Sequence, residues 1–187
     1  QSPASQATIG NQAPTAGPCY INPISSNAIS IAAGPGTTKV FCNCTFTDTN
    51  GNADIVAINA SLYNVSAGEG GMASGTASNL FRYNNASCSR MNGAGNIVHG
   101  NCTFDVQYYA AVGNWTCSMH ANDSQSASVT NFTNYTVNAL VAVGNAPSTV
   151  NYGSVNPAAN SSIVSDNTTN FGNVVVDIKF ESTNLTS

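Results

Sequence analysis

VFCNCTF, residues 40–46, decides the fold class of this chain. Apolar side chains occupy its even positions from Val40 to Phe46, and the odd position Asn43 begins an Asn-x-Thr sequon for N-glycosylation. Strict alternation is typical of a β-strand that buries one face. The segment therefore predicts a half-buried strand with a glycan acceptor on its solvent face.

The same alternation recurs in three further segments. Even positions are apolar in residues 56–62, beginning with Val56, and in residues 102–108, whereas odd positions are apolar in residues 115–121. Turns rich in Gly and Asn separate these runs, and no stretch has a sustained helical period with caps. We therefore predict an all-β chain of short strands that forms a sandwich or barrel.

Sequons are about twice as frequent as chance predicts. The chain has 27 Asn and 40 Ser plus Thr among 187 residues, so random placement gives roughly six sequons, against the twelve present. The acceptors are Asn43, Asn59, Asn64, Asn85, Asn101, Asn114, Asn122, Asn131, Asn134, Asn160, Asn167 and Asn184. An Asn- and Thr-rich composition alone also generates sequons, but the outward parity on four predicted strands favours a glycosylated surface protein outside the cytoplasm.

Two acceptors depart from this parity. Asn131 and Asn134 lie three residues apart, so they cannot both face outward from one regular strand. We therefore expect a bulge or a strand end between them.

The charge content argues against several partners. Only 6% of the residues are charged, against about 25% in a typical domain, and the formal net charge is −4. Four cations leave no basic stripe for phosphates, so we expect no nucleic acid partner. No apolar run approaches the roughly 20 residues of a membrane span, so we expect no membrane span. No leader precedes Gln1, so we expect a processed chain. We also expect no cofactor.

The composition divides the chain into three parts. Residues 1–35 are rich in Pro, Ser and Ala and predict an extended N-terminal arm, while residues 36–137 hold enough strands for one complete domain. Residues 138–187 predict a partial second β-domain, because about 40 residues rarely bury enough surface to fold alone. Its clearest predicted strand has alternating apolar residues: Val174, Val176, Ile178 and Phe180. This part must pack on the first domain or receive a strand from another copy.

The cysteines indicate an oxidising compartment and three disulfides. The six are Cys19, Cys42, Cys44, Cys88, Cys102 and Cys117. Cys42 and Cys44 share one strand face, so parity cannot choose between their partners. Their C-x-C spacing is not that of a zinc knuckle, and we expect no metal-thiolate site.

Four segments carry a resemblance to a known family. FCNCTFTD (41–48), INASLY (58–63), GNWTC (113–117) and AND (121–123) resemble the Ig-like β-sandwich domains of archaeal secreted and cell-surface proteins. The resemblance covers residues 36–137. A weaker one, through NFGNV at 170–174, suggests a second Ig-like unit cut short. The glycosylated, charge-poor chain also resembles subunits of archaeal extracellular threads and pili.

The resemblance implies both a disulfide pattern and a mode of assembly. On an Ig-like fold an early-strand cysteine meets Cys117 across the sheets, and we expect the pairs Cys44–Cys117, Cys88–Cys102 and Cys19–Cys42. In such filaments an N-terminal strand of one subunit commonly completes the sheet of the next. Residues Gln1 to Gly10 and Ala28 to Ala33 are the candidate donor segments.

Candidate catalytic residues form no motif. His99 and His120 lack a nucleophile or metal pattern around them, and Glu69 and Asp105 show no local pattern of a paired-carboxylate glycosidase. We expect no enzyme.

One run offers oxygen ligands at alternate positions: Asp48, Asn50, Asn52 and Asp54. Such a run can bind calcium, but its Gly is misplaced for an EF-hand loop and no bidentate Glu follows. An Asn-Gly hairpin turn between two strands is favoured.

Two function classes remain. The first is a structural subunit of an extracellular filament, assembled head to tail through strand complementation with other copies of itself. The second is a surface adhesin or carbohydrate-binding module, in which Tyr63, Tyr83 or Tyr109 would face a sugar. The scattered tyrosines favour the structural subunit.

Overall fold

The computed structural model describes residues 10–22, 28–70, 75–146 and 150–179, and in these ranges the chain is built from β-strands. One 3-10 turn, η1 (Val65–Ala67), interrupts them. The strands are β1 (Thr15–Asn22), β2 (Ala28–Ile29), β3 (Thr37–Thr47), β4 (Ile55–Asn64), β5 (Arg82–Asn85), β6 (Ser89–Asn92), β7 (Ile97–Gln107), β8 (Gly113–Asp123), β9 (Ser128–Val137), β10 (Val143–Ala146) and β11 (Asn167–Asn170). The all-β prediction is confirmed.

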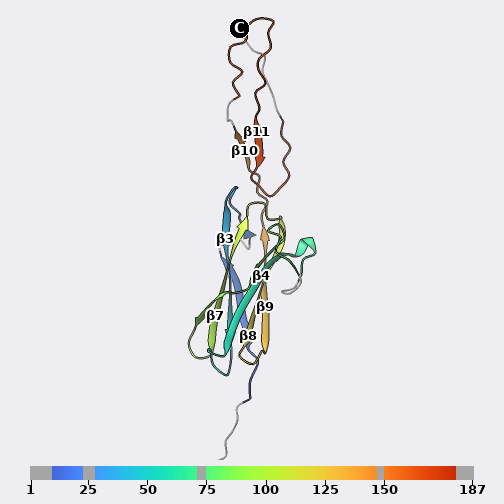
Figure 1. The fold of residues 1–187 in the computed structure, drawn as a ribbon. Coiled ribbons are helices and arrows are strands. Elements are labelled where there is room, and N and C mark those ends of the chain that lie inside the picture. The colour runs from blue at the N-terminus through green and yellow to red at the C-terminus, as the bar shows by residue number, and fades with distance from the viewer. Residues whose placement is uncertain (1–9, 23–27, 71–74, 147–149, 180–187) are drawn as a thin grey trace, which may run out of the picture.

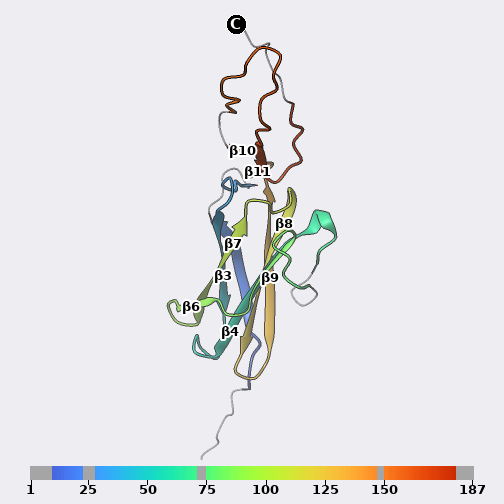
Figure 2. The same ribbon diagram turned by 45° about the horizontal axis from the view of Figure 1, so that its top comes forward.

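Two sheets form a sandwich, and a separate ribbon projects from one end of it (Figure 1). The first sheet has the order β1-β3-β7-β6 and the second has the order β2-β9-β8-β4-β5. Figure 2 shows the two layers running along the same long axis, with β10 and β11 beyond them. All pairings are antiparallel except that of β2 with β9.

The core follows the predicted parity. Even positions of β3 and β7 and odd positions of β8 are buried between the sheets, and Trp115 is 0% exposed. Val56 is an exception, because a register irregularity between Ile55 and Ala57 turns it outward and buries Ile55 in its place. Such an irregularity adds a residue to one strand and shifts its parity.

The expected irregularity at Asn131 and Asn134 is wrong. β9 pairs with β8 without a register shift from Ser128 to Val137. Asn131 has inward parity at the sheet edge, where its Nδ2 donates to Gly17 O of β1 at 2.7 Å. A neighbouring backbone thus satisfies the inward amide without a bulge.

The described part of the expected arm, residues 10–22 and 28–35, contributes two strands to the sandwich. β1 pairs with β3 at the edge of the first sheet, and β2 pairs with the end of β9. Ile29 and Ile31 are buried, at 0% and 6% exposure. Residues 1–35 contain few large apolar side chains, so their sequence does not predict these strands. Only alternate residues of an edge strand need to be apolar.

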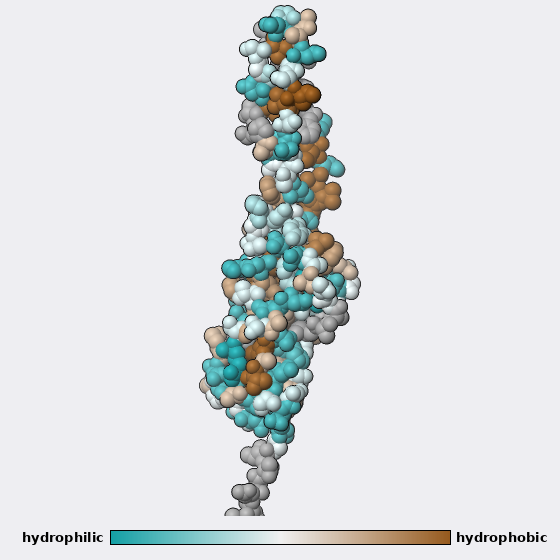
Figure 3. Space-filling model, in the orientation of Figure 1, coloured by the Kyte–Doolittle hydropathy of each residue, from teal (hydrophilic) through white to brown (hydrophobic). Residues whose placement is uncertain are grey.

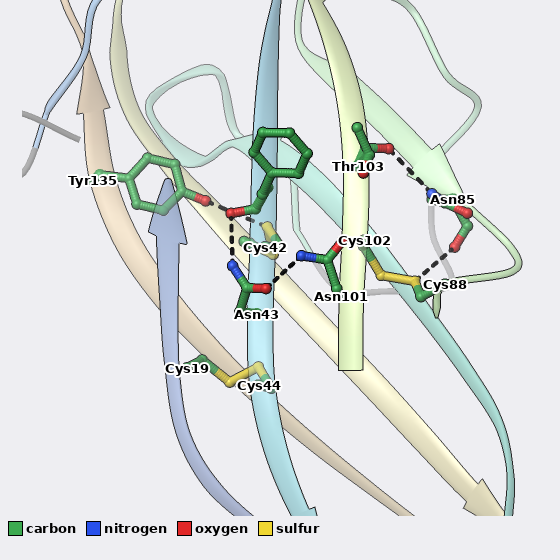
Figure 4. Close-up of a disulfide and its surroundings, with 12 residues drawn as sticks. Cys19, Cys42, Asn43, Cys44, Asn85, Cys88, Asn101, Cys102, Thr103 and Tyr135 are labelled. Carbon is green, nitrogen blue, oxygen red and sulfur yellow. Dashed lines mark hydrogen bonds between the residues drawn. A yellow bond between two sulfur atoms is a disulfide. The ribbon is translucent and has the colours of Figure 1, made fainter. Parts of the chain in front are cut away.

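The disulfides correct two of the three expected pairs. Cys42 of β3 bridges the sheets to Cys117 of β8, and Cys19 of β1 binds Cys44. Cys44 lies directly opposite Cys19 in the β1–β3 register, so it forms its disulfide with the edge strand β1 (Figure 4). The third bridge, Cys88–Cys102, is as expected, and the described residues contain no free cysteine.

The segment between β3 and β4 is not a hairpin. The two strands lie in opposite sheets, so residues 48–54 form a corner that crosses from one layer to the other. Asp48 O accepts from Gly51 N and Gly51 O accepts from Asp54 N, each at 3.0 Å. Gly51 has a φ of 113°, which its lack of a Cβ allows.

Residues 138–187 form no second sandwich in their described part. β10 and β11 make a two-stranded sheet there, with no third strand in residues 138–146 and 150–179. Across the described chain, no helix has the length and apolar character that a bilayer span needs.

Candidate functional site

The ribbon of β10 and β11 is the most incomplete part of the described fold. Its register runs from Val143↔Asn170 to Ala146↔Asn167, and neither strand pairs with a further strand in the described chain. Four residue pairs in a lone two-stranded sheet are marginal in water. Each strand therefore has an outer edge along which no further strand of the described chain is paired.

Specific contacts fasten this ribbon to the sandwich. Gly34 N donates to Phe171 O at 2.9 Å, and at the base of the ribbon itself Phe171 N donates to Ala142 O at 2.8 Å. Asn173 Nδ2 donates to Ala110 O and Asn138 O, both at 3.0 Å. The base of the projection is thus held in place.

Apolar side chains are exposed along this projection, as Figure 3 shows on one face. Ile163 is 97% exposed and Val175 is 95% exposed. The others are Val141, Val143, Tyr152, Val155 and Ile178. A chain with so few charges rarely leaves such residues in water unless another surface covers them.

The predicted strand at residues 174–180 is not observed in its described part. Val174 and Val176 are half-buried, Ile178 is exposed, and residues 174–179 pair with no strand; Phe180 lies outside the described residues. Its alternating pattern is that of a strand, and in this chain the pattern lacks a partner.

The described N-terminal residues lie at the opposite end of the sandwich (Figure 1). Asn11 Nδ2 donates to Asp123 Oδ2, and Gln12 N donates to Asn50 Oδ1, each at 2.8 Å. Of the two candidate donor segments, residues 1–9 lie outside the described residues. The other, residues 28–33, is built into its own sandwich and is not free to leave.

The glycan acceptors differ in accessibility. Asn114, Asn134, Asn160 and Asn167 are exposed, and the half-buried ones are Asn43, Asn59, Asn85, Asn101, Asn122 and Asn131. Asn184 lies outside the described residues. Asn43 and Asn101 face each other in the β3–β7 register and are hydrogen-bonded (Figure 4).

Asn64 is the exception, at 1% exposure. Its Nδ2 donates to Ala111 O and Val112 O, both at 3.3 Å, and its Oδ1 accepts from Ala67 N at the start of η1. This amide serves the fold, and its burial opposes the attachment of a glycan at Asn64.

The candidate catalytic residues do not meet. His99 and His120 lie in different sheets, each beside a threonine hydroxyl. Glu69 pairs with Arg82, and Asp105 pairs with Lys39. The two carboxylates therefore serve separate ion pairs.

The candidate sugar-facing tyrosines are mostly buried. Tyr63 and Tyr83 are 8% and 6% exposed, and Tyr109 is 37% exposed. Burial raises the pKa of Tyr83 to about 12, and burial also raises the pKa of Tyr135. Tyr63 and Tyr83 are therefore buried, and of the three candidates Tyr109 alone is exposed.

The four oxygen-bearing residues of the corner separate into two groups. Asp48 and Asp54 converge, whereas Asn52 Nδ2 donates to Gly93 O at 3.4 Å and Asn50 accepts from Gln12. Asp123 joins the two aspartates from the β8–β9 turn. Sequence reasoning missed it because the corner and that turn are distant in sequence, and a lone acidic turn residue gives no local signal.

Comparisons with known proteins give weak likenesses. No family model and no curated protein matches the chain. Among solved structures, it is similar to a Niemann-Pick type C2 protein from Japanese carpenter ant, at 9% identity and a TM-score of 0.34, covering 68% of this chain and 93% of that one.

Two pilus proteins are also similar. The major pilin subunit BcpA of Bacillus cereus has 10% identity and a TM-score of 0.35, covering 72% of this chain and 43% of that one. AggA, the major subunit of aggregative adherence fimbriae type I from Escherichia coli, has 12% identity and a TM-score of 0.27, covering 70% and 97%. All three TM-scores lie below 0.5, so none of these likenesses establishes a shared fold.

Proposed function

We propose that this protein is the structural subunit of a heavily N-glycosylated extracellular filament. Subunits join head to tail, and the N-terminal segment of one copy adds as a strand to the ribbon of the next. The observation that carries the proposal is the β10–β11 ribbon, which has only two strands in the described chain and exposes apolar residues. The proposal assigns the chain no catalysis and no cofactor.

The two ends of the molecule are suited to a polar assembly. The ribbon leaves one end of the sandwich and the N-terminal residues leave the other (Figure 1). A head-to-tail contact joins two different surfaces of neighbouring subunits, and it builds an open chain when the rotation between neighbours does not close into a ring. We therefore expect an open linear polymer.

A donated strand would satisfy the ribbon in two ways. It would form hydrogen bonds with the backbone along an outer edge of the ribbon, and it would cover exposed valine side chains such as Val143 and Val175. Addition of a third strand also brings the ribbon to the size at which small sheets become stable. Residues 1–9 remain as the donor, because residues 28–33 are part of the core.

The glycan acceptors support an exposed, extracellular surface around such a filament. Ten acceptors in the described chain are exposed or half-buried. Three disulfides fit the same compartment. Glycans would supply the hydrophilic surface that charged side chains supply in most proteins.

The alternative of a carbohydrate-binding module has less support. Two shallow hollows lie on the second sheet, and two sequon residues line each of them, Asn114 and Asn134 in one and Asn59 and Asn85 in the other. Glycans attached there would fill the hollows.

Site-specific photocrosslinking tests the proposed contact. Benzoylphenylalanine at Val175 should crosslink to a peptide from residues 1–9 of another copy in assembled material. The matched control is benzoylphenylalanine at Tyr20, which is 54% exposed on β1 and should give no such peptide. Crosslinks from Val175 to the sandwich alone would contradict strand donation.

A further inference from the structure

Three carboxylates meet at the end of the sandwich where the N-terminal residues leave. Asp48 follows β3, Asp54 precedes β4 and Asp123 ends β8, and one oxygen of each lies within 4.8 Å of the other two. Asp48 is 0% exposed and Asp123 is 2% exposed. Two separate loops thus bring ionisable oxygens together in a largely buried position.

Neutral donors orient these carboxylates. Asp123 Oδ1 accepts from Gln125 N and Ala127 N at 2.9 and 2.7 Å, and Asp54 accepts from the Ser124 hydroxyl. The Asn11 amide also donates to Asp123 Oδ2, at 2.8 Å. The donors therefore fix the side chain of Asp123.

One oxygen in this cluster has no hydrogen-bond partner among the described residues. Asp48 Oδ1 accepts from Asn50 N at 2.8 Å, but Asp48 Oδ2 is buried and accepts no hydrogen bond from them. Buried carboxylate oxygens are normally hydrogen-bonded or bound to a cation. The unpartnered oxygen belongs to the residue that meets Asp54 and Asp123, so a ligand at their meeting point would satisfy it.

Protein cations do not balance the cluster. Lys39 pairs with Asp105 and Arg82 pairs with Glu69, and in the described part of the chain no ion pair includes the three aspartates. Arg90 Nη2 donates to the carbonyl oxygen of Asn52 in the β3–β4 corner at 2.7 Å.

We propose that Asp48, Asp54 and Asp123 bind one Ca²⁺. Oxygen-only ligands suit a hard cation, and Ca²⁺ accepts the irregular geometry and added water or carbonyl ligands that loop sites provide. Mg²⁺ demands closer octahedral geometry and binds such a site less well. The ion would tie the β3–β4 corner to the β8–β9 turn, and through Asn11 to the start of the described chain.

Ca²⁺ binding at this site does not depend on the filament proposal, whereas the role of the ion in assembly does. If residues 1–9 are the donor strand, the ion fixes the point from which that strand leaves its own subunit. Measurements on the unassembled chain therefore test the site by itself.

Equilibrium dialysis and thermal unfolding of the full unglycosylated chain, stripped with EGTA, test the site with Ca²⁺ as the probe. We expect about one Ca²⁺ per chain with a dissociation constant of about 10⁻³ M or lower, as in extracellular modules. At about 10 mM Ca²⁺ the Tm should rise by several degrees, and equal Mg²⁺ should raise it less.

Two variants make the result specific. Asp48→Asn should weaken Ca²⁺ binding at least about tenfold without lowering the metal-free Tm, because it removes one of three clustered negative charges. Asp54→Asn serves as a second, less buried variant with the same expectation, and Asp177→Asn, an equal change on an exposed residue, should bind as the original chain does. Absence of binding at about 10 mM Ca²⁺, or undiminished binding by both cluster variants, would overturn the proposal.

Discussion

At the scale of single residues, Arg82 is the most unusual side chain in the described chain. It is fully buried, and its Nε lies 2.9 Å from Oε2 of Glu69, whose side chain is 32% exposed. Its Cζ lies 4.9 Å from the ring centre of Tyr63, and its Nη2 donates to Gly70 O. A buried guanidinium needs this full set of partners because it cannot give up its charge.

Removal of the carboxylate should therefore destabilise the fold. We expect Glu69→Ala to lower the free energy of unfolding by about 2 kcal/mol, less than for a fully buried pair because Glu69 is partly in water. Asp105→Ala is the control, since the Lys39–Asp105 pair is exposed and should change stability by under about 0.5 kcal/mol. Urea unfolding measures both, and equal losses would contradict the role given to Arg82.

Buried tyrosines predict how stability depends on alkaline pH. The pKa of Tyr83 is raised to about 12 from its ordinary value near 10, so folding opposes its ionisation. Stability from this group is complete below pH 10 and is lost as the pH rises through about 12. Tyr83→Phe should flatten the fall in unfolding free energy between these two pH values, and an unchanged profile would count against burial as the cause.

Asn64 gives a prediction about glycosylation. Because its amide is buried and bonded to two carbonyls, we expect the Asn64 peptide to be unmodified in native material, whereas the exposed Asn160 carries a glycan. Glycopeptide mapping by mass spectrometry decides this. Full occupancy of Asn64 would mean that the 64–67 turn differs in the mature protein.

At the scale of elements, the sequence predicts the regular strands and misses the irregular connections. β3, β7 and β8 are strands with a buried face, and alternation alone identifies them. The sequence predicts a hairpin at residues 48–54, because an Asn-Gly turn signal does not reveal whether the next strand joins the same sheet. Asp123 and the Cys19–Cys44 pair depend on that three-dimensional arrangement, and no local pattern encodes it.

The three disulfides should differ in their contribution to stability. Chain entropy predicts about 4.5 kcal/mol for Cys42–Cys117, about 3.5 kcal/mol for Cys19–Cys44 and about 3 kcal/mol for Cys88–Cys102, from sequence separations of 75, 25 and 14. Paired Cys→Ala variants measured by thermal unfolding should follow this order. The inter-sheet pair should also cost the most because both of its sulfurs are in the core. A larger loss from the Cys88–Cys102 pair would contradict this account.

At the scale of the whole molecule, the structure shows that a test of assembly requires deletion of residues 1–9 and not of residues 1–35. Deletion of residues 1–35 would remove β1 and β2 together with Ile29 and Ile31, so it should unfold the sandwich. Deletion of residues 1–9 removes the proposed donor segment and leaves every described strand. The shorter deletion separates assembly from folding.

Electron microscopy of the full chain and of the chain lacking residues 1–9, at equal concentration, tests the filament proposal most directly. The full chain should form regular filaments of indefinite length, and the truncated chain should stay monomeric with the same β-rich circular dichroism spectrum. Identical filaments from both chains would show that the N-terminal segment is not the donor. A full chain that remains monomeric at every accessible concentration would contradict the account as a whole.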